Sequence, residues 1–184
     1  MYRISNDLRI TKSADKIVES LFRCSKKHNL DDITFSMLSK DSGVSRATIY
    51  RIFDNVNDIL LYKGSLLYDE IKKHKKIENF KEHVLYVIDF WIANSNYLEV
   101  IFKNYKYNIF IELHYQNLDY FEQLFDTKFD KNNIKTQYMI STITSLIPTF
   151  LHSWYSHNKK ETPEELYEYM CYSLTSLSKL IKNR

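Results

Sequence analysis

The sequence predicts an all-α fold. Only two Gly and two Pro occur among 184 residues, whereas average usage is about 7% and about 5%, so few turn residues remain for a β-rich fold. Apolar residues recur at helical spacing over long stretches with few helix breakers. With 44% hydrophobic residues, the chain can bury a sizeable core. We therefore expect about nine helices, divided between a small N-terminal domain and a larger C-terminal one.

The first helix is expected to follow a short polar arm. Residues 1–11 are polar and basic, and a frayed terminus is favoured there over an arm that touches DNA. Apolar residues then recur at the spacing of one helix face. These residues are Ala14, Ile17, Val18, Leu21 and Phe22. The resulting amphipathic helix should pack behind the segment that follows it.

Residues 33–60 predict two short helices joined by a tight turn, and then the start of a longer helix. Thr34 can cap the first short helix. Gly43 can adopt the positive φ that a sharp turn between helices commonly requires. Ser45 can accept a hydrogen bond from the free N–H groups at the start of the second. This arrangement is typical of a helix-turn-helix, which presents one helix to the major groove of DNA.

The second short helix has two distinct faces when it is laid out at about 100° per residue. Ile49, Ile52 and Phe53 share one face and should pack inward. The other face carries guanidinium groups, a phenol, hydroxyls and a methyl group, which suit guanine edges, phosphate oxygens and thymine methyls. With the first turns of both helices included, the predicted DNA-contacting residues are Thr34, Ser36, Ser45, Arg46, Ala47, Thr48, Tyr50 and Arg51.

Residues 10–60 closely resemble the DNA-binding domain of TetR-family transcriptional regulators. The shared pattern comprises DDIT before the first short helix, SGVSRATIYRIF across the turn and second helix, and DNVNDIL into the next helix. The segment from Trp154 to Met170 also looks like the last loop and final helix of many such regulators. The resemblance implies a helix-turn-helix DNA-binding domain at residues 1–55 and a helical regulatory and dimerisation domain at 56–184, with 56–76 as the connecting helix.

The resemblance also implies a function. TetR-like regulators act as homodimers on palindromic operators in double-stranded DNA, most often as repressors that a small ligand releases. An activator, or an adaptor that works through a protein partner, is the alternative interpretation. An all-α enzyme is a third and weaker one.

Two positions depart from the family pattern. Val56 stands where the family usually has a lysine that contacts phosphate, so non-specific affinity should be weaker unless Arg51 or Lys63 substitutes. Asn29 stands where a glycine usually ends the first helix. We expect this change to be conservative because Asn tolerates the left-handed conformation.

The connecting helix should begin with a cap formed by Asn55 and Asp58. The lysines near its end are expected to be solvated and favoured by the helix dipole, and a direct DNA role for them is less favoured. These lysines are Lys72, Lys73, Lys75 and Lys76. Further helices are expected at about 78–93, 96–105, 107–127, 132–157 and 163–182. The last should start at Pro163 after Thr162, and Pro148 should kink the helix before it.

The last two helices are the predicted dimer interface, because TetR-like regulators pair them with their partner's equivalents as a four-helix bundle. A separate argument also favours a dimer, since one short recognition helix covers only a few base pairs. The predicted interface residues are Ile143, Ile147, Phe150, Trp154, Leu166, Met170, Leu174 and Leu177. The alternative, that they belong to the core of one chain, stays open.

Aromatic residues crowd residues 86–125, where an effector pocket for a small apolar or aromatic molecule would lie. Core packing explains the crowding equally well. The predicted lining residues are Phe90, Trp91, Phe110, His114 and His152.

Charge and motif content restrict the possible functions. The net charge is +3, and residues 1–76 carry 15 Lys and Arg against 10 Asp and Glu, so the basic half contains the helix-turn-helix. Cys24 and Cys171 have no metal-ligand spacing and are expected to be free thiols. No metal-binding His pair, phosphate-binding loop or catalytic motif is present, so no metal, cofactor or enzymatic activity is predicted. Without a signal peptide or a long apolar run, we expect a soluble cytoplasmic protein with no membrane partner.

Overall fold

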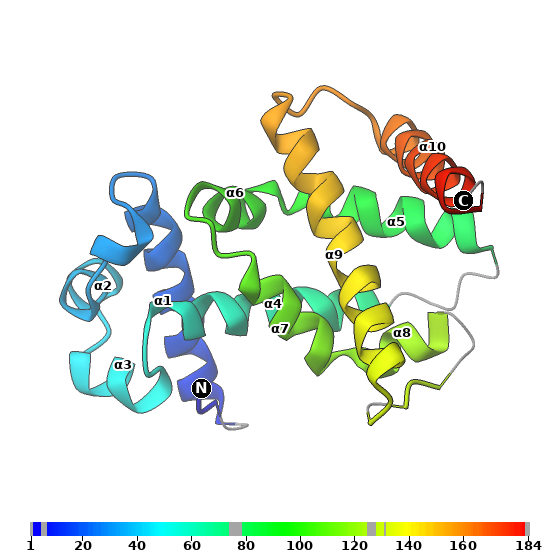
Figure 1. Ribbon diagram of the computed structural model, residues 1–184. Helices are drawn as coiled ribbons and strands as arrows, with labels where there is room; N and C mark the ends of the chain where they lie inside the picture. The colour runs from blue at the N-terminus through cyan, green and yellow to red at the C-terminus, as the bar shows by residue number, and fades with distance from the viewer. Residues whose placement is uncertain (1, 5–6, 74–78, 125–127, 131, 183–184) are drawn as a thin grey trace. The chain divides into compact units, whose positions relative to one another are not determined.

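The computed structural model describes residues 2–4, 7–73, 79–124, 128–130 and 132–182 (Figure 1). All regular secondary structure in these ranges is helical, so the all-α prediction is confirmed. They contain ten α-helices and one 3-10 turn, where the sequence predicted about nine helices.

The N-terminal elements are α1 (Leu8–Ser25), the 3-10 turn η1 (Leu30–Asp32), α2 (Phe35–Ser42), α3 (Arg46–Ile52) and α4 (Val56–Lys73). They are followed by α5 (Phe80–Ala93), α6 (Ser95–Lys103), α7 (Asn108–Gln116), α8 (Leu118–Leu124), α9 (Ile134–Ser156) and α10 (Pro163–Lys182).

The chain packs as two compact units. The first comprises Met1–Glu70 with Glu99–Gln116, and the second comprises Ile71–Leu98 with Asn117–Arg184. The division between the units falls within α4 and α6. The functional boundary between residues 55 and 56 is a separate matter and stays a prediction.

In the first unit, α1 packs against α2 and α3, and α2 packs against α3. Figure 1 shows these three helices gathered together. The predicted apolar face of α1 is confirmed, because Ala14, Ile17, Val18 and Leu21 are buried and Phe22 is half-buried. The fully buried residues of α2, α3, the α3 cap and α4 include Leu38, Ile49, Ile52, Phe53, Ile59, Leu60 and Leu67.

The predicted N-terminal arm is wrong in extent. α1 begins at Leu8, because the Asp7 carboxylate accepts a hydrogen bond from the Arg9 backbone N–H at 2.8 Å and caps the helix. Tyr2 and Arg3, before the cap, are also hydrogen-bonded rather than frayed. The Arg3 N–H donates to the Ile52 carbonyl at 2.7 Å, and the Tyr2 hydroxyl donates to Ser65 Oγ of α4 at 2.9 Å. The carbonyls at the end of α3 lack helical partners, and Arg3 satisfies one of them.

In the second unit, α5, α9 and α10 pack against one another. Val84, Ile88 and Trp91 of α5 are buried. Their buried counterparts on the other two helices include Ile140, Leu151, Trp154, Leu166 and Met170. α10 starts as predicted: the Thr162 N–H donates to Glu165 Oε2 at 2.8 Å, and the Glu165 N–H donates to Thr162 Oγ1 at 3.2 Å. This reciprocal pair is a capping box, and Pro163 occupies the first helical position.

Two local predictions are wrong. Residues 107–127 do not form one helix, because α7 ends at Gln116 and α8 begins at Leu118. Asn117 lies between them and is buried, and its carbonyl accepts the Tyr120 N–H at 3.1 Å, which starts a new helix. Asn29 is not left-handed, since its φ is −66° and its ψ is 150°. η1 makes the connection to α2 without a positive φ at that residue.

The described residues contain no helix long and apolar enough to cross a membrane. They also contain no group of three or more His, Cys, Asp or Glu residues placed to hold a metal ion. Cys24 and Cys171 are free and half-buried, as predicted. Lys75 and Lys76 of the predicted lysine run lie outside the described residues. Lys72 forms an ion pair with Asp119 at 3.2 Å, so it is not simply solvated.

Candidate nucleic-acid interface

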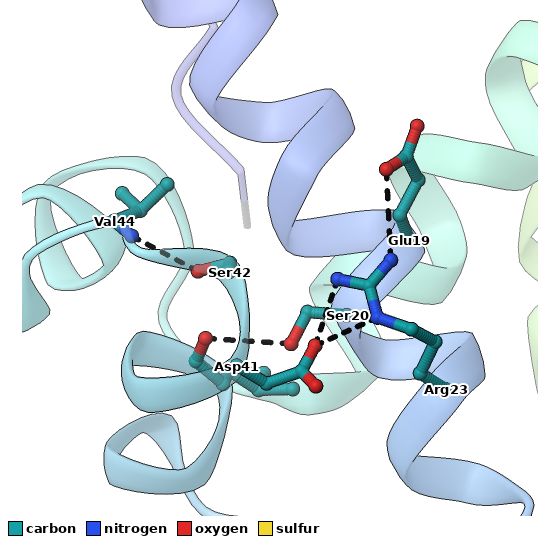
Figure 2. Close-up of polar contacts among 7 residues, drawn as sticks. Glu19, Ser20, Arg23, Asp41, Ser42 and Val44 are labelled. Atoms are coloured by element: carbon teal, nitrogen blue, oxygen red, sulfur yellow. Dashed lines mark hydrogen bonds and ion pairs between the residues drawn. The ribbon is translucent and has the colours of Figure 1, made fainter.

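The turn between α2 and α3 is built as the sequence predicts. The Thr34 hydroxyl accepts the Met37 N–H at 3.3 Å and caps α2. Gly43 ends α2 with a φ of +71°, and its N–H donates to the Ser39 carbonyl at 3.1 Å. The Ser42 hydroxyl then accepts the Val44 N–H at 3.1 Å, a bond drawn in Figure 2. The chain thus turns sharply between the two helices within a few residues, as a helix-turn-helix requires.

Helix α3 has one buried and one exposed face. Ser45 accepts the Thr48 N–H at 3.2 Å and caps the helix. Ile49 and Ile52 are fully buried. The opposite face is open to solvent: Arg46, Ala47, Tyr50 and Arg51 are exposed and Thr48 is half-buried. The predicted division of this helix into an inner and an outer face is confirmed.

The start of α2 and the outer face of α3 form one continuous surface. Arg46 Nη1 donates to Ser36 Oγ at 3.2 Å. The Tyr50 ring packs with its edge against Phe35, with the ring centroids 4.9 Å apart. Thr34 and Ser36 are exposed beside these contacts. We call this surface the recognition surface, and all the predicted DNA-contacting residues lie on it. These are Thr34, Ser36, Ser45, Arg46, Ala47, Thr48, Tyr50 and Arg51.

Helix α2 is fixed on α1 by polar contacts as well as by the core (Figure 2). The Arg23 guanidinium bridges Asp41 at 2.8 Å and Glu19 at 3.7 Å. The hydrogen bond from Arg23 holds the pKa of Asp41 below its usual range, and Ser20 adds to the effect. The Ser20 hydroxyl also donates to the Leu38 carbonyl at 3.3 Å. The recognition surface is therefore carried by a well-connected three-helix support.

Comparison with known proteins shows which solved structures share this architecture. No protein-family model matches the chain, and no curated protein matches it. Among solved structures, the chain is similar to the Listeria innocua protein Lin0861, with a TM-score of 0.78 at 20% identity over 95% of this chain and 96% of that one. It is also similar to a TetR transcriptional regulator from Streptococcus agalactiae 2603V, with a TM-score of 0.58 at 18% identity over 89% and 94%. The chain has the fold of TetR transcriptional regulators.

A further neighbour with this fold is the fatty acid degradation regulator FadR from Bacillus halodurans. The TM-score is 0.59 at 16% identity, over 91% of this chain and 94% of that one. At such low identities the likeness establishes the TetR fold only. What the recognition surface binds has to be argued from its own residues.

The start of α4 departs from the TetR-family pattern. The Asp58 N–H donates to Asn55 Oδ1 at 3.1 Å, which confirms the predicted cap. Val56 is half-buried at the first position of the helix. Lys63 lies seven residues further on, about 10 Å along the axis. Arg51 on α3 is exposed and Lys63 is half-buried, and the replacement of the missing lysine by either of them stays a prediction.

The predicted effector-pocket residues belong to both units. Phe110 and His114 lie in the first unit, whereas Phe90, Trp91 and His152 lie in the second. Trp91, Phe110 and His114 are each 2% exposed, and Phe90 and His152 are half-buried. Within the second unit, a cavity bounded by α5, α9 and α10 measures about 10 Å³, room for about one water. That cavity is too small for an effector, and the pocket stays a prediction.

His114 makes a buried contact that sequence reasoning missed. The Tyr68 hydroxyl of α4 lies 3.0 Å from His114 Nε2 of α7, and His114 Nδ1 hydrogen-bonds to the Phe110 carbonyl. Burial lowers the pKa of His114 to about 4, although the bond to Phe110 opposes the shift. The imidazole is thus neutral at pH 7. Sequence gave no signal for this pair, because 46 residues separate its members.

The predicted interface residues on α9 and α10 fall into two groups. Trp154, Leu166 and Met170 are buried within the second unit. These three residues therefore belong to the core of one chain, which was the alternative to an interface role. Leu174 and Leu177 are 40% and 55% exposed. Ile147 and Phe150 are half-buried, and the Ile143 side chain lies outside the described residues. The residues still available to a partner are therefore mainly on the second half of α10.

Proposed function

We propose that this protein is a homodimeric, sequence-specific DNA-binding transcriptional regulator that acts on a palindromic operator. The observation that carries the proposal is the recognition surface itself. An exposed helix face with two guanidinium groups, a phenol and small methyl-bearing side chains stands on a rigid helix-turn-helix. The TetR fold of the chain agrees with this assignment.

The recognition surface offers groups for both kinds of DNA contact. Arg46 and Arg51 can donate paired hydrogen bonds to guanine edges or to phosphates. The methyls of Ala47 and Thr48 suit thymine methyls. The hydroxyls at the start of α2 suit phosphate oxygens, since the first helix of such a motif crosses the DNA backbone. The surface therefore combines positioning with base recognition.

A second copy of the chain is the partner that α10 fits. Leu166 and Met170 are buried, and the same helix face continues at a spacing of three to four residues with Leu174, Leu177 and Ile181, which are exposed. An apolar face that one chain covers only in part is typical of an interface. Two copies joined there would supply two recognition helices, one for each half of a palindrome.

The regulatory part of the proposal is a repressor that a small apolar or aromatic effector releases from DNA. Support comes from α4, which directly follows the recognition helix and is hydrogen-bonded to α7 through Tyr68 and His114. An activator, or an adaptor acting through a protein partner, is the second candidate. Val56 stands at the position of the phosphate-binding lysine. This favours the adaptor, because the absence of that lysine removes one DNA contact.

Selection of bound duplexes from a random pool tests the function directly. A palindromic motif is the expected outcome. Arg46→Ala and Tyr50→Ala should each weaken binding to the selected duplex at least about fivefold in gel shifts, because a good base contact contributes about 1–3 kcal/mol. Tyr105→Ala is the matched control, since Tyr105 is 80% exposed in the same unit but off the recognition surface. No duplex preference, together with capture of a stoichiometric protein partner, would replace the proposal with the adaptor.

A further inference from the structure

A basic groove lies next to helix α2 and is separate from the recognition surface. It is an open space of about 760 Å³ between the C-terminal end of α1 and α2. Half of its eight lining residues are cationic, namely Arg23, Lys26, Lys27 and Lys40. The groove belongs entirely to the first unit.

The three lysines are the part of this lining that is free to bind. The Arg23 guanidinium is already engaged by Asp41 and Glu19. Lys26, Lys27 and Lys40 are exposed, and none forms an ion pair with any residue that the structure describes. Three like charges around one concave surface attract a polyanion. Ammonium groups act as point charges on phosphates rather than as readers of base edges.

Helix α2 separates the groove from the recognition surface. Ser36 of α2 touches Arg46 of α3, while Met37 and Asp41 of α2 line the groove. Lys40 follows Ser36 by one turn and also lines the groove, so its charge lies between the two surfaces. The order across the unit is therefore α3, then α2, then the groove.

This order indicates which anion the groove meets. With α3 in the major groove, the first helix of the motif crosses the sugar-phosphate backbone. The groove lies on the adjacent flank of that helix, beside the path that the strand would take as it leaves the half-site. We propose that the lysine groove binds the phosphate backbone of duplex DNA outside the half-site that α3 reads. The proposal rests on the proposed DNA-binding function and extends the contact beyond the recognition surface.

Two duplexes that carry the selected motif test the proposal. One ends at the edges of the motif, and the other extends about ten base pairs beyond each edge. The variant is Lys26→Gln with Lys27→Gln and Lys40→Gln. The charge-matched control is Lys103→Gln with Lys135→Gln and Lys160→Gln, which removes three exposed lysines outside the groove, the recognition surface and α10. Affinity is measured by fluorescence anisotropy over a range of salt concentrations.

On the extended duplex, the groove variant should bind at least about tenfold more weakly than the parent. Its log–log salt slope should be smaller by about 5, because a dimer with two grooves loses up to six phosphate contacts and each contributes about 0.9. On the trimmed duplex both quantities should stay near the parent values, and the control should match the parent on both. A Lys→Arg triple variant at the same positions should restore the slope.

Other results overturn the inference in distinguishable ways. If the salt slope on the extended duplex is unchanged while Arg46→Ala still weakens binding, the groove does not bind the DNA backbone. The proposed function is then unaffected. Equal losses on both duplexes assign the lysines to the half-site or to a small anion instead. If the parent selects no duplex at all, the proposed function and the groove fail together. Footprinting gives an independent readout, since protection outside the motif should disappear only in the groove variant.

Discussion

At Gly43 the backbone adopts a φ of +71°, a conformation that costs an L-residue about 1–2 kcal/mol. Beyond Gly43 and its two chain neighbours, no heavy atom lies within 4 Å of the place where a Cβ would stand, so the cost of a side chain there is conformational. Gly43→Ala should lower the free energy of unfolding by roughly 1 kcal/mol, because part of the strain is offset by reduced freedom of the unfolded chain. Urea denaturation followed by circular dichroism measures the change.

Asparagine at the same position separates backbone strain from other effects. Asn tolerates the left-handed region better than alanine does. Gly43→Asn should therefore be less destabilising than Gly43→Ala, although its side chain is larger. The reverse order would mean that crowding, rather than φ, determines what this turn accepts.

Single residues with local partners were the most predictable features. Thr34, Gly43, Ser45 and Thr162 act within three or four residues of themselves, so their spacing along the chain defines their contacts. Asn117 and the segment before α1 behaved differently. The apolar pattern continues across Asn117 and hides the break between α7 and α8. The position of Arg3 depends on its hydrogen bond to the free Ile52 carbonyl at the end of α3, about 50 residues away.

At the scale of elements, α4 and α7 are joined by a buried polar pair. Tyr68 and His114 are 3% and 2% exposed, so a charge on the imidazole would be poorly solvated. Burial lowers the pKa of His114 to about 4, against about 6.5 for an unfolded chain. Between these two pH values the unfolded state binds more protons than the folded state. The contribution of His114 to stability is therefore complete above about pH 6.5 and is lost progressively as the pH falls towards 4.

Comparison of the parent with His114→Gln isolates this effect from the carboxylates. The difference in unfolding free energy between the two should change by about 2 kcal/mol from pH 7 to pH 5, with the parent losing more stability. His28→Gln serves as the control because His28 is exposed. Equal acid sensitivity of the parent and His114→Gln would mean that His114 does not resist protonation in the folded state.

Elements were predicted well from periodicity, but the contacts between them were not. The predicted ranges for α9 and α10 lie within two residues of the observed ones, because long amphipathic stretches define them. The lysine groove could not be predicted, since its lysines come from α2 and from the turn that follows α1, which packing brings together. For the same reason, spacing alone could not separate buried Leu166 and Met170 from exposed Leu174 and Leu177.

At the scale of the whole molecule, a regulator of palindromic DNA needs two recognition helices. The second half of α10 is one of the places where the described part of the chain leaves large apolar side chains uncovered, and the first half of α9 is another. Leu177, Leu180 and Ile181 are 55%, 68% and 76% exposed. Covering them with a second copy would remove this apolar surface from water. The proposed dimer therefore accounts for an exposure that a monomer leaves unexplained.

Leu174→Glu combined with Leu177→Glu tests the dimer. Both positions are already partly solvated in the single chain, so the variant should fold and keep its helical content. Sedimentation should show a monomer where the parent is a dimer, since two carboxylates per chain would be buried against their equivalents. Affinity for the selected palindrome should fall by about 100-fold or more, because the second half-site no longer benefits from a linked partner.

Tyr105→Glu provides the matched control, as Tyr105 is 80% exposed and lies in the other unit. It adds the same kind of charge to an exposed apolar residue and should leave the oligomeric state unchanged. A double variant that remains dimeric would move the interface away from α10. A double variant that becomes monomeric but keeps parental affinity would show that one recognition surface is enough for binding. A palindromic operator would then not be required.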